Sequence, residues 1–123
     1  MINCKISDII SRLNTANKLN KTKIIIPYSK EIFNILQILN KETTNIFKIK
    51  KINNFEIEIL LLNKFHKITI LSTFGRRRFI SVNNIRTLDR GLGFYILRTS
   101  QGFMSCFSAL EKNIGGELIL KFK

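Results

Sequence analysis

The chain has 123 residues, 45% of them hydrophobic, which suits one globular domain or two very small ones sharing a core and argues against disorder throughout. Its 21 Lys and Arg residues against 8 Asp and Glu residues give a formal net charge of +13. A balance this basic bears on partners rather than on fold. It favours nucleic acid first and an anionic membrane surface second.

The first half of the chain predicts two helices and three strands. Apolar residues recur at helical spacing from Ile6 to Ala16, which predicts an amphipathic helix with one buried stripe. A short strand is expected at Lys23–Ile26, and Ser29 is placed to cap a second helix whose apolar face spans 32–39.

Residues 46–52 and 55–62 are then expected to pair as a hairpin around Asn53-Asn54, a pair that tolerates positive φ. Period-two alternation predicts four inward and two outward side chains, which are Phe55, Ile57, Ile59 and Leu61 inward, and Glu56 and Glu58 outward.

The second half predicts mainly strands, at 67–72, 78–82 and in the last third, with a short helix near 108–112. The predicted fold class is α+β, with an N-terminal α-β-α-β-β half followed by a mainly β C-terminal half with a short helix. We place the boundary between residues 1–70 and 71–123, and the two halves can pack as one body.

The sequence offers little material for a metal site or a membrane span. Cys4 and Cys106 lie far apart, neither belongs to a CxxC pair, and His66 is the single histidine. We therefore expect no metal and no cofactor. No run is long and apolar enough to cross a bilayer.

The most informative residues lie in the last third. Gly91-Leu92-Gly93, Thr99-Ser100-Gln101-Gly102 and Gly115-Gly116-Glu117 punctuate short β runs with glycines and hydroxyl residues. Glycine lets a backbone approach another surface closely, and hydroxyl groups both donate and accept hydrogen bonds. With this net charge, the surface that such loops approach is predicted to be a polyanion.

These three motifs, in this order, resemble the C-terminal signatures of the small-subunit ribosomal protein S-eight family of bacteria and organelles. Ser7–Leu13 is similar to the family's opening helix, and Ile26–Lys30 to its proline-serine-lysine turn. Each motif alone is weak because short Gly/Ser patterns recur by chance. Together they match at family-like spacing over nearly the whole length.

The chain departs from the family pattern at two places. Ser72-Thr73-Phe74-Gly75 stands where the family usually has Ser-Arg-Pro-Gly, and the following arginines at 76–78 can restore the positive charge. Gln101 stands at the lysine position of the family's Thr-Ser-Lys-Gly loop. This change removes one phosphate contact and keeps a hydrogen-bonding side chain.

The resemblance implies a structural constituent of the small ribosomal subunit that binds the central domain of small-subunit rRNA and helps its assembly. The expected partners are that rRNA and neighbouring small-subunit ribosomal proteins, with no membrane and no small-molecule substrate. Loops of small polar residues suit the shallow minor groove of an A-form helix or an unstacked segment. The expected RNA-binding residues are Arg12, Lys23, Ser29, Lys30, Arg76, Arg77, Arg78, Phe79, Thr99, Ser100, Gln101, Gly102, Gly115, Gly116 and Glu117.

Within this set, Arg77 fits the family's retained arginine, and the three arginines are expected to project alternately rather than all one way. Phe79 stands where the family often has tyrosine and can stack on a base or sugar. Glu117 has two possible roles. It can accept hydrogen bonds from a base amino group, which the resemblance favours, or it can anchor Ser100 or an arginine from within the protein.

Two other function classes compete with this hypothesis. A small basic RNA-processing or RNA-modifying enzyme needs an acid/base pair or a nucleophile in a cleft, and one histidine with scattered carboxylates supports it poorly. A membrane-binding protein needs a basic amphipathic helix with apolar anchors, and that leaves the β-rich remainder unexplained.

The residue choice also bears on the compartment. Isoleucine, lysine, asparagine and phenylalanine are used heavily, and their codons are rich in A and T. The resemblance begins within the first ten residues, which leaves no room for a presequence. We therefore expect synthesis inside an organelle and favour the mitochondrial matrix, with a plastid or the bacterial cytoplasm as alternatives.

Overall fold

The computed structural model describes residues 2–43, 46–72, 75–88 and 93–123 and confirms a mixed α+β fold. In chain order its elements are α1 (Ile2–Lys18), β1 (Lys23–Pro27), α2 (Lys30–Glu42), β2 (Phe47–Lys51), β3 (Glu56–Leu61), β4 (Ile68–Ile70), β5 (Phe79–Ile80), α3 (Val82–Thr87), β6 (Phe94–Thr99), β7 (Gly102–Ser105), α4 (Cys106–Lys112) and β8 (Gly116–Phe122).

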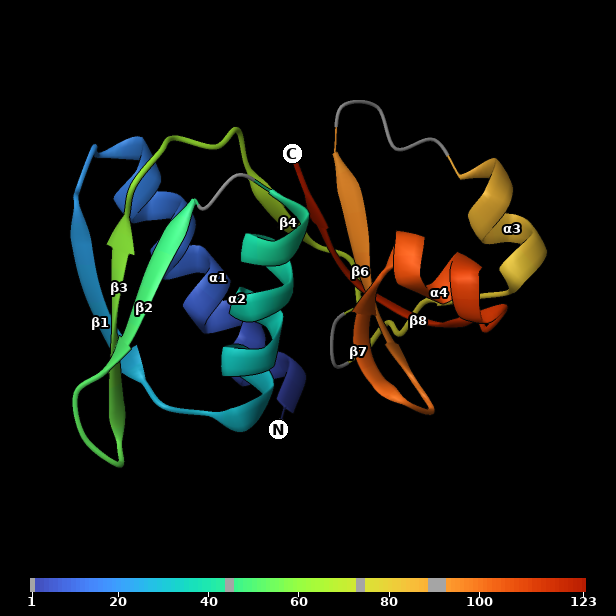
Figure 1. Cartoon of the computed structure of the whole chain (residues 1–123), viewed down its shortest axis with the longest axis horizontal. Helices are drawn as coiled ribbons and strands as arrows, with labels where there is room; N and C mark the ends of the chain where they lie inside the picture. The colour runs from blue at the N-terminus through green and yellow to red at the C-terminus, as the bar shows by residue number, and fades with distance from the viewer. Residues whose placement is uncertain (1, 44–45, 73–74, 89–92) are drawn as a thin grey trace.

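The N-terminal half is an antiparallel sheet in the order β1-β3-β2, covered by α1 and α2. The two helices lie between this sheet and the C-terminal half (Figure 1). The periodicity of α1 predicted its buried face correctly, because all five residues of the stripe are buried. They are Ile6, Ile9, Ile10, Leu13 and Ala16.

The predicted hairpin of β2 and β3 is confirmed, but its turn differs from the expectation. Ile57 and Ile59 are fully buried, whereas Phe55 is 79% exposed. Strand β3 begins only at Glu56, so Phe55 lies in the turn and outside the alternating pattern. Neither asparagine has a positive φ. Instead, Asn53 Oδ1 accepts hydrogen bonds from the N–H groups of Phe55 (2.7 Å) and Glu56 (2.9 Å).

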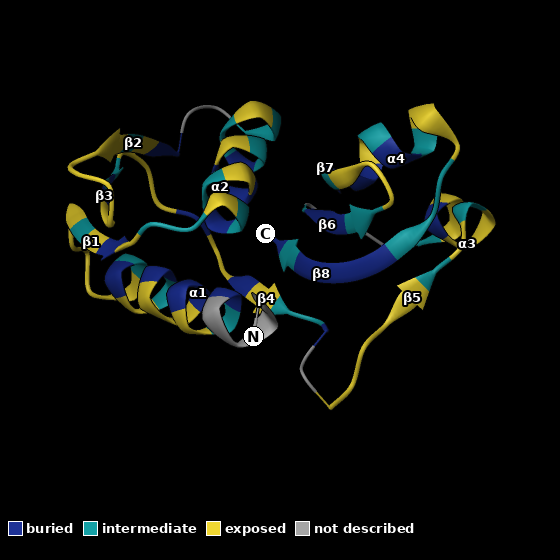
Figure 2. Ribbon diagram, turned by 90° about the horizontal axis from the view of Figure 1, so that it is seen from below, coloured by how far each residue is buried: buried dark blue, intermediate teal, exposed yellow. Residues whose placement is uncertain are grey.

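The C-terminal half is built around β8, which pairs with β6 along one edge and with β4 and β5 along the other. Strand β7 pairs with the far edge of β6, and α4 packs on β6 and β7. Because β8 is enclosed on both edges, most of its length is buried (Figure 2). Strand β4, on the N-terminal side of the expected boundary at residue 70, pairs with β8 of the C-terminal half; the boundary itself stays a prediction.

Two short helices follow capping residues in the second half. The predicted strand 78–82 ends at Ile80, and Val82 opens α3, a helix that the sequence pattern did not predict. Ser81 caps it by accepting from the N–H of Asn84. Helix α4 begins at Cys106, two residues before the expected start, because Ser105 caps it through the N–H of Ser108.

The second helix of the N-terminal half begins where predicted, but its cap differs. Ser29 occupies the N-cap position of α2 with extended backbone, and its hydroxyl makes no capping bond. It donates instead to Glu31 Oε2 at 2.7 Å.

The two halves share one hydrophobic core and a polar connection. The core cluster contains residues of both halves, and Phe65 places its ring 5.6 Å from that of Phe47 and 5.5 Å from that of Phe122. Asn14 donates to the carbonyl of Ile68 (2.7 Å) and accepts from its N–H (3.0 Å). One turn later, Asn17 makes the same pair of bonds with Phe65. Among the helices in the described residues, none is long and apolar enough to span a membrane.

Candidate nucleic-acid interface

Three of the predicted RNA-binding segments meet around the start of β8. Register pairs place Glu117 beside Phe79 of β5 and beside Arg98 of β6. The same β6 continues into the turn that Thr99 and Gly102 close. The fold therefore brings together residues 76–79, 99–102 and 115–117, which are up to 41 positions apart in the sequence.

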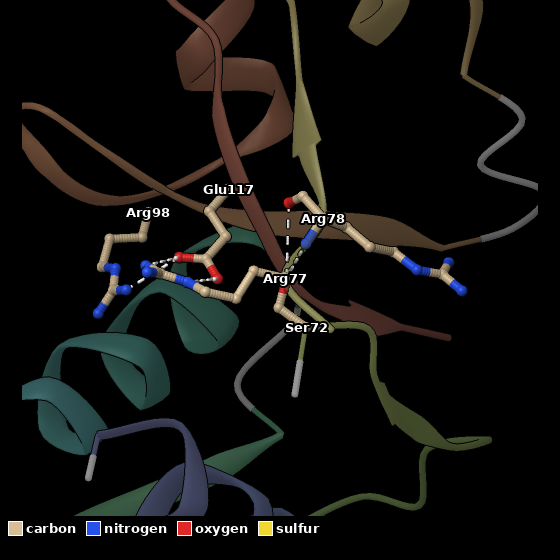
Figure 3. A network of polar contacts seen from close by, with 5 residues as sticks. All are labelled: Ser72, Arg77, Arg78, Arg98 and Glu117. Atoms are coloured by element: carbon tan, nitrogen blue, oxygen red, sulfur yellow. Dashed lines mark hydrogen bonds and ion pairs between the residues drawn. The ribbon is translucent and has the colours of Figure 1, made fainter. Parts of the chain in front are cut away.

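The centre of this cluster is the Glu117 carboxylate, which is 2% exposed (Figure 3). Arg77 forms a bidentate pair with it, from Nε to Oε2 at 3.1 Å and from Nη2 to Oε1 at 3.0 Å. Arg98 donates from Nη2 to Oε1 at 2.9 Å. The arrangement matches the alternative in which Glu117 anchors an arginine from within the protein. A direct bond from Glu117 to an RNA base stays a prediction.

This network shifts the acid–base equilibria of its members. The hydrogen bond from Arg77 lowers the pKa of Glu117 below its ordinary value, with further help from Arg98 and against the opposing effect of burial. The same bond to Glu117 raises the pKa of Arg77. Glu117 is therefore an anion at neutral pH, and because it faces two arginine side chains, the site keeps a net positive charge.

Ser72 holds the backbone of the segment that carries the arginines by a hydrogen bond across it. Its hydroxyl is buried and accepts from the N–H of Arg78 at 2.9 Å, while the Arg78 carbonyl accepts from the N–H of Leu118 on β8 at 2.8 Å. The side chains of Arg77 and Arg78 extend in opposite directions (Figure 3), as alternate projection predicts. Arg77 lies 5.5 Å from the exposed ring of Phe79, within cation–π range.

The turn between β6 and β7 presents two predicted contact side chains to solvent, those of Ser100 and Gln101. The hydroxyl of Thr99 bonds within the turn itself, because it donates to the carbonyl of Gly102 (2.9 Å) and accepts from the N–H of Gln101 (3.1 Å). Ser100 and Gln101 are exposed. Gly102 has a φ of +103°, a backbone conformation that is strained for any residue with a side chain. Thr99 and Gly102 thus have a structural role in shaping the turn that carries Ser100 and Gln101.

Gly115 and Gly116 also have a structural reason to be glycine. A Cβ on Gly115 would lie 2.5 Å from the carbonyl oxygen of Ile80, and one on Gly116 would lie 2.6 Å from that of Arg98. Both glycines therefore allow β8 to approach its neighbours closely. That the two glycines also let RNA approach the backbone closely stays a prediction.

The remaining predicted residues belong to the N-terminal half and carry local partners. Exposed Arg12 pairs with Asp8 at 3.5 Å on α1, and Lys23 pairs with Glu58 at 3.7 Å across β1 and β3. Lys30 is exposed at the start of α2, next to Ser29. Both side chains of the Arg12–Asp8 pair are exposed, and such pairs contribute little to stability, so a phosphate can replace Asp8 at small cost. Arg12 also lines a cleft of about 320 Å³ with residues of α1, β1 and the loop between them, namely Ser11, Thr15, Ala16, Lys21 and Ile24.

Sequence reasoning missed Arg98 as a member of this site. Its contact with Glu117 depends on the pairing of β6 with β8, and that register shifts at a bulge between Ile96 and Leu97. No spacing rule along the chain could have revealed it. Two predicted features, Gly91-Leu92 of the first motif and Thr73-Phe74 of the departing turn, lie outside the described residues.

The chemistry of the site is that of anion and base recognition. It offers paired guanidinium groups, an exposed aromatic ring, a serine hydroxyl and a glutamine amide, all of which bind phosphate, sugar or base edges. Among the described residues, no group of His, Cys, Asp and Glu side chains could hold a metal ion.

Comparison with known proteins gives a consistent result. Residues 5–122 match the family described as Ribosomal protein S8. The chain is 37% identical over 127 residues to "Small ribosomal subunit protein uS8c" of Helicosporidium sp. subsp. Simulium jonesii, covering 94% of this chain and 93% of the relative. It is 32% identical to "Small ribosomal subunit protein uS8" of Afipia carboxidovorans, covering 93% and 92%, and 32% identical to that of Brucella abortus, covering 94% of each.

Proposed function

The chain belongs to the ribosomal protein S8 family, and from this membership we propose that it binds the central domain of small-subunit rRNA and helps that RNA to assemble. The family consists of structural proteins of the small ribosomal subunit and not of enzymes, so the RNA-processing alternative is set aside. Neighbouring small-subunit proteins are its further proposed partners.

One observation carries the proposal of RNA binding. The Glu117 carboxylate holds Arg77 and Arg98 together beside the exposed turn of Ser100 and Gln101. A guanidinium has five N–H donors, so both arginines keep donors for phosphates after binding Glu117. Phosphate contacts fix the register of the RNA, and the polar turn supplies contacts to bases or ribose hydroxyls in the wide minor groove.

A binding titration tests this proposal directly. The full chain is titrated with the isolated central-domain helix of small-subunit rRNA from the same source, at several salt concentrations, and with a scrambled duplex of equal length as the control. We expect a preference for the native helix that survives moderate salt. Equal and steeply salt-sensitive binding to both duplexes would contradict site-specific recognition, because non-specific binding is almost wholly electrostatic.

The exposed serine of the turn gives a sharper test. Ser100→Ala is expected to weaken binding of the native helix by about 1–3 kcal/mol, because an RNA group left without its partner in the complex is costly. Thr69→Ala, which removes another exposed hydroxyl on β4, is the matched control and is expected to bind like the unaltered chain. Unchanged affinity of a folded Ser100→Ala variant would remove Ser100 from the interface.

We also propose that the protein acts in mitochondrial ribosomes. The heavy use of residues whose codons are rich in A and T, and the departures at Thr73-Phe74 and at Gln101 from the bacterial family pattern, support an organelle. Detection of the protein in ribosomes of purified mitochondria from the source cell would agree with this proposal. Its recovery in plastid ribosomes, or in the cytoplasm of a bacterium, would contradict it.

A further inference from the structure

The turn of the β2–β3 hairpin holds an aromatic ring out in solvent. Phe55 is the most exposed large hydrophobic residue among those that the structure describes. Its backbone is nevertheless fixed, since its N–H donates to Asn53 Oδ1 and its carbonyl accepts from the N–H of Tyr28, both at 2.7 Å. An exposed ring forgoes the stabilisation of burial, so a ring held out on an ordered turn points to a contact surface.

The neighbours of Phe55 are aromatic and basic. Lys51, at the end of β2, places its Nζ 4.7 Å from the centre of the Tyr28 ring, and that ring packs against Phe33 at 6.1 Å. Exposed Lys30 follows Tyr28 by two residues. We call Tyr28, Lys30, Lys51 and Phe55 the hairpin-tip surface. Glu56 follows Phe55 and Glu31 follows Lys30, so carboxylates also lie next to this surface, and the Glu31 carboxylate accepts a hydrogen bond from Ser29.

The hairpin-tip surface faces the same side of the molecule as the candidate interface. In Figure 1 the β2–β3 turn, the start of α2 and the β6–β7 turn all project toward the lower edge of the view. The β2–β3 turn belongs to the N-terminal sheet and the β6–β7 turn to the C-terminal one. A long RNA that contacts Ser100 and Gln101 can therefore continue along this side to the hairpin.

We propose that the hairpin-tip surface binds an unpaired nucleotide of the RNA, with the base stacked on Phe55 and a neighbouring phosphate held by Lys51 or Lys30. Aromatic side chains stack on bases that are free of a helix, and lysines beside them attract the backbone. The lysines favour RNA over an apolar protein surface as the occupant. This inference rests on the proposed binding of rRNA, but its residues are separate from the cluster around Glu117.

The test uses the absence of tryptophan from the chain. Phe55→Trp makes the hairpin the sole source of tryptophan fluorescence, and Leu19→Trp, at a 60% exposed position after α1, is the matched control. Each full-length variant is titrated with small-subunit rRNA. We expect quenching of the Phe55→Trp signal and little change for Leu19→Trp. We also expect Phe55→Ala to weaken binding at least about fivefold and Phe55→Tyr to retain it.

The outcomes separate this inference from the proposed function. If rRNA binding still depends on Ser100 while the Phe55→Trp signal and the Phe55→Ala affinity do not change, the hairpin inference is overturned and the proposed function stands. A Phe55→Trp signal that changes only when small-subunit proteins are added would overturn it in favour of a protein contact. Failure of the unaltered chain to bind rRNA would overturn both.

Discussion

Glu117 shows how one buried carboxylate can organise two cations on the surface. Its side chain is almost wholly enclosed, whereas the side chain of Arg77 is 50% exposed and that of Arg98 is 28% exposed. A charge this buried requires partners, and the two guanidinium groups satisfy it while their outer edges remain in water. The carboxylate thus fixes the rotamers of both long side chains before a phosphate binds. The arginines therefore lose less conformational entropy when they bind that phosphate.

Glu117→Gln removes the negative charge and keeps the size of the side chain. We expect the free energy of unfolding to fall by about 1–2 kcal/mol, a value discounted for the exposure of both arginines. Urea denaturation at pH 7 measures this difference. Equal stability of the variant and the unaltered chain would show that the ion pairs contribute nothing to folding.

The same variant has a predicted dependence on pH. Because folding lowers the pKa of Glu117 from its ordinary value of 4.5, its ionised form stabilises the folded state fully above that value. The contribution is lost as the pH falls through the lower folded pKa. The stability difference between the unaltered chain and Glu117→Gln should therefore be constant near neutrality and shrink below pH 4.5. A difference that grows on acidification would contradict the direction of the shift.

At the scale of elements, the two glycines before Glu117 let β8 lie between strands that approach closely. Gly116→Ala introduces a Cβ 2.6 Å from the carbonyl oxygen of Arg98, so β8 and β6 must separate. We expect about 1–3 kcal/mol of destabilisation, typical of overpacking. Gly75→Ala, with nothing within 4 Å of the added atom, is the control and should unfold near the unaltered chain in thermal denaturation. Similar melting temperatures for both variants would contradict the packing argument.

Helix α1 is connected to Phe65 and to Ile68, the first residue of β4, by asparagine side chains that bond to the backbone as a neighbouring strand would. Asn14 and Asn17 lie one turn apart, and each both donates to and accepts from one backbone residue of the extended segment. The amides thereby satisfy the carbonyls and N–H groups of Phe65 and Ile68 at the edge of the sheet, where no strand of the described residues pairs with β4. The connection between the halves is consequently specific in register, not only apolar.

Asn14→Ala is expected to lower the free energy of unfolding by about 2 kcal/mol, because it leaves the N–H and carbonyl of Ile68 without this partner in a partly buried place. The control is Asn34→Ala at an exposed position of α2. Alanine favours helix at both sites, so propensity cancels between them. Chemical denaturation that gives the same midpoint for the two variants would refute a stabilising role of the Asn14 hydrogen bonds.

The sequence predicted elements better where one physical signal dominated. The stripe of α1 is long and periodic, so its helix and its buried face follow directly. Helix α3 was missed because Val82–Thr87 is short and rich in residues with weak helix propensity, and its Ser81 cap decides its start. The exposure of Phe55 was mispredicted because alternation was extended beyond the strand. The Arg98–Glu117 contact required the three-dimensional register of two strands.

At the scale of the whole molecule, the charge is spread over both halves. Arg12, Lys23 and Lys30 lie on the N-terminal half, and the arginine run lies beside β8. This distribution predicts that phosphate contacts contribute affinity along a long face, while the turn of Ser100 and Gln101 contributes discrimination.

The salt dependence of binding separates these contributions. Arg77→Ala should reduce the magnitude of the slope of log K against log salt concentration by about one unit at most, since one phosphate contact is lost. Arg86→Ala, on the exposed surface of α3, is the control and should leave the slope unchanged. Filter-binding titrations over a range of salt concentrations measure both slopes. Equal reductions would mean that any exposed cation of the chain contributes.

The position of β8 in the sheet has a consequence for the nascent chain on the ribosome. Ribosomes make a chain from its N-terminus, so β4, β5 and β6 are all synthesised before the strand that joins them. Until residues 116–122 leave the exit tunnel, Arg77 and Arg98 lack the carboxylate that gathers them. The cation cluster therefore forms only after β8 has joined the sheet, and a chain that still lacks β8 presents to RNA a basic segment without this organisation.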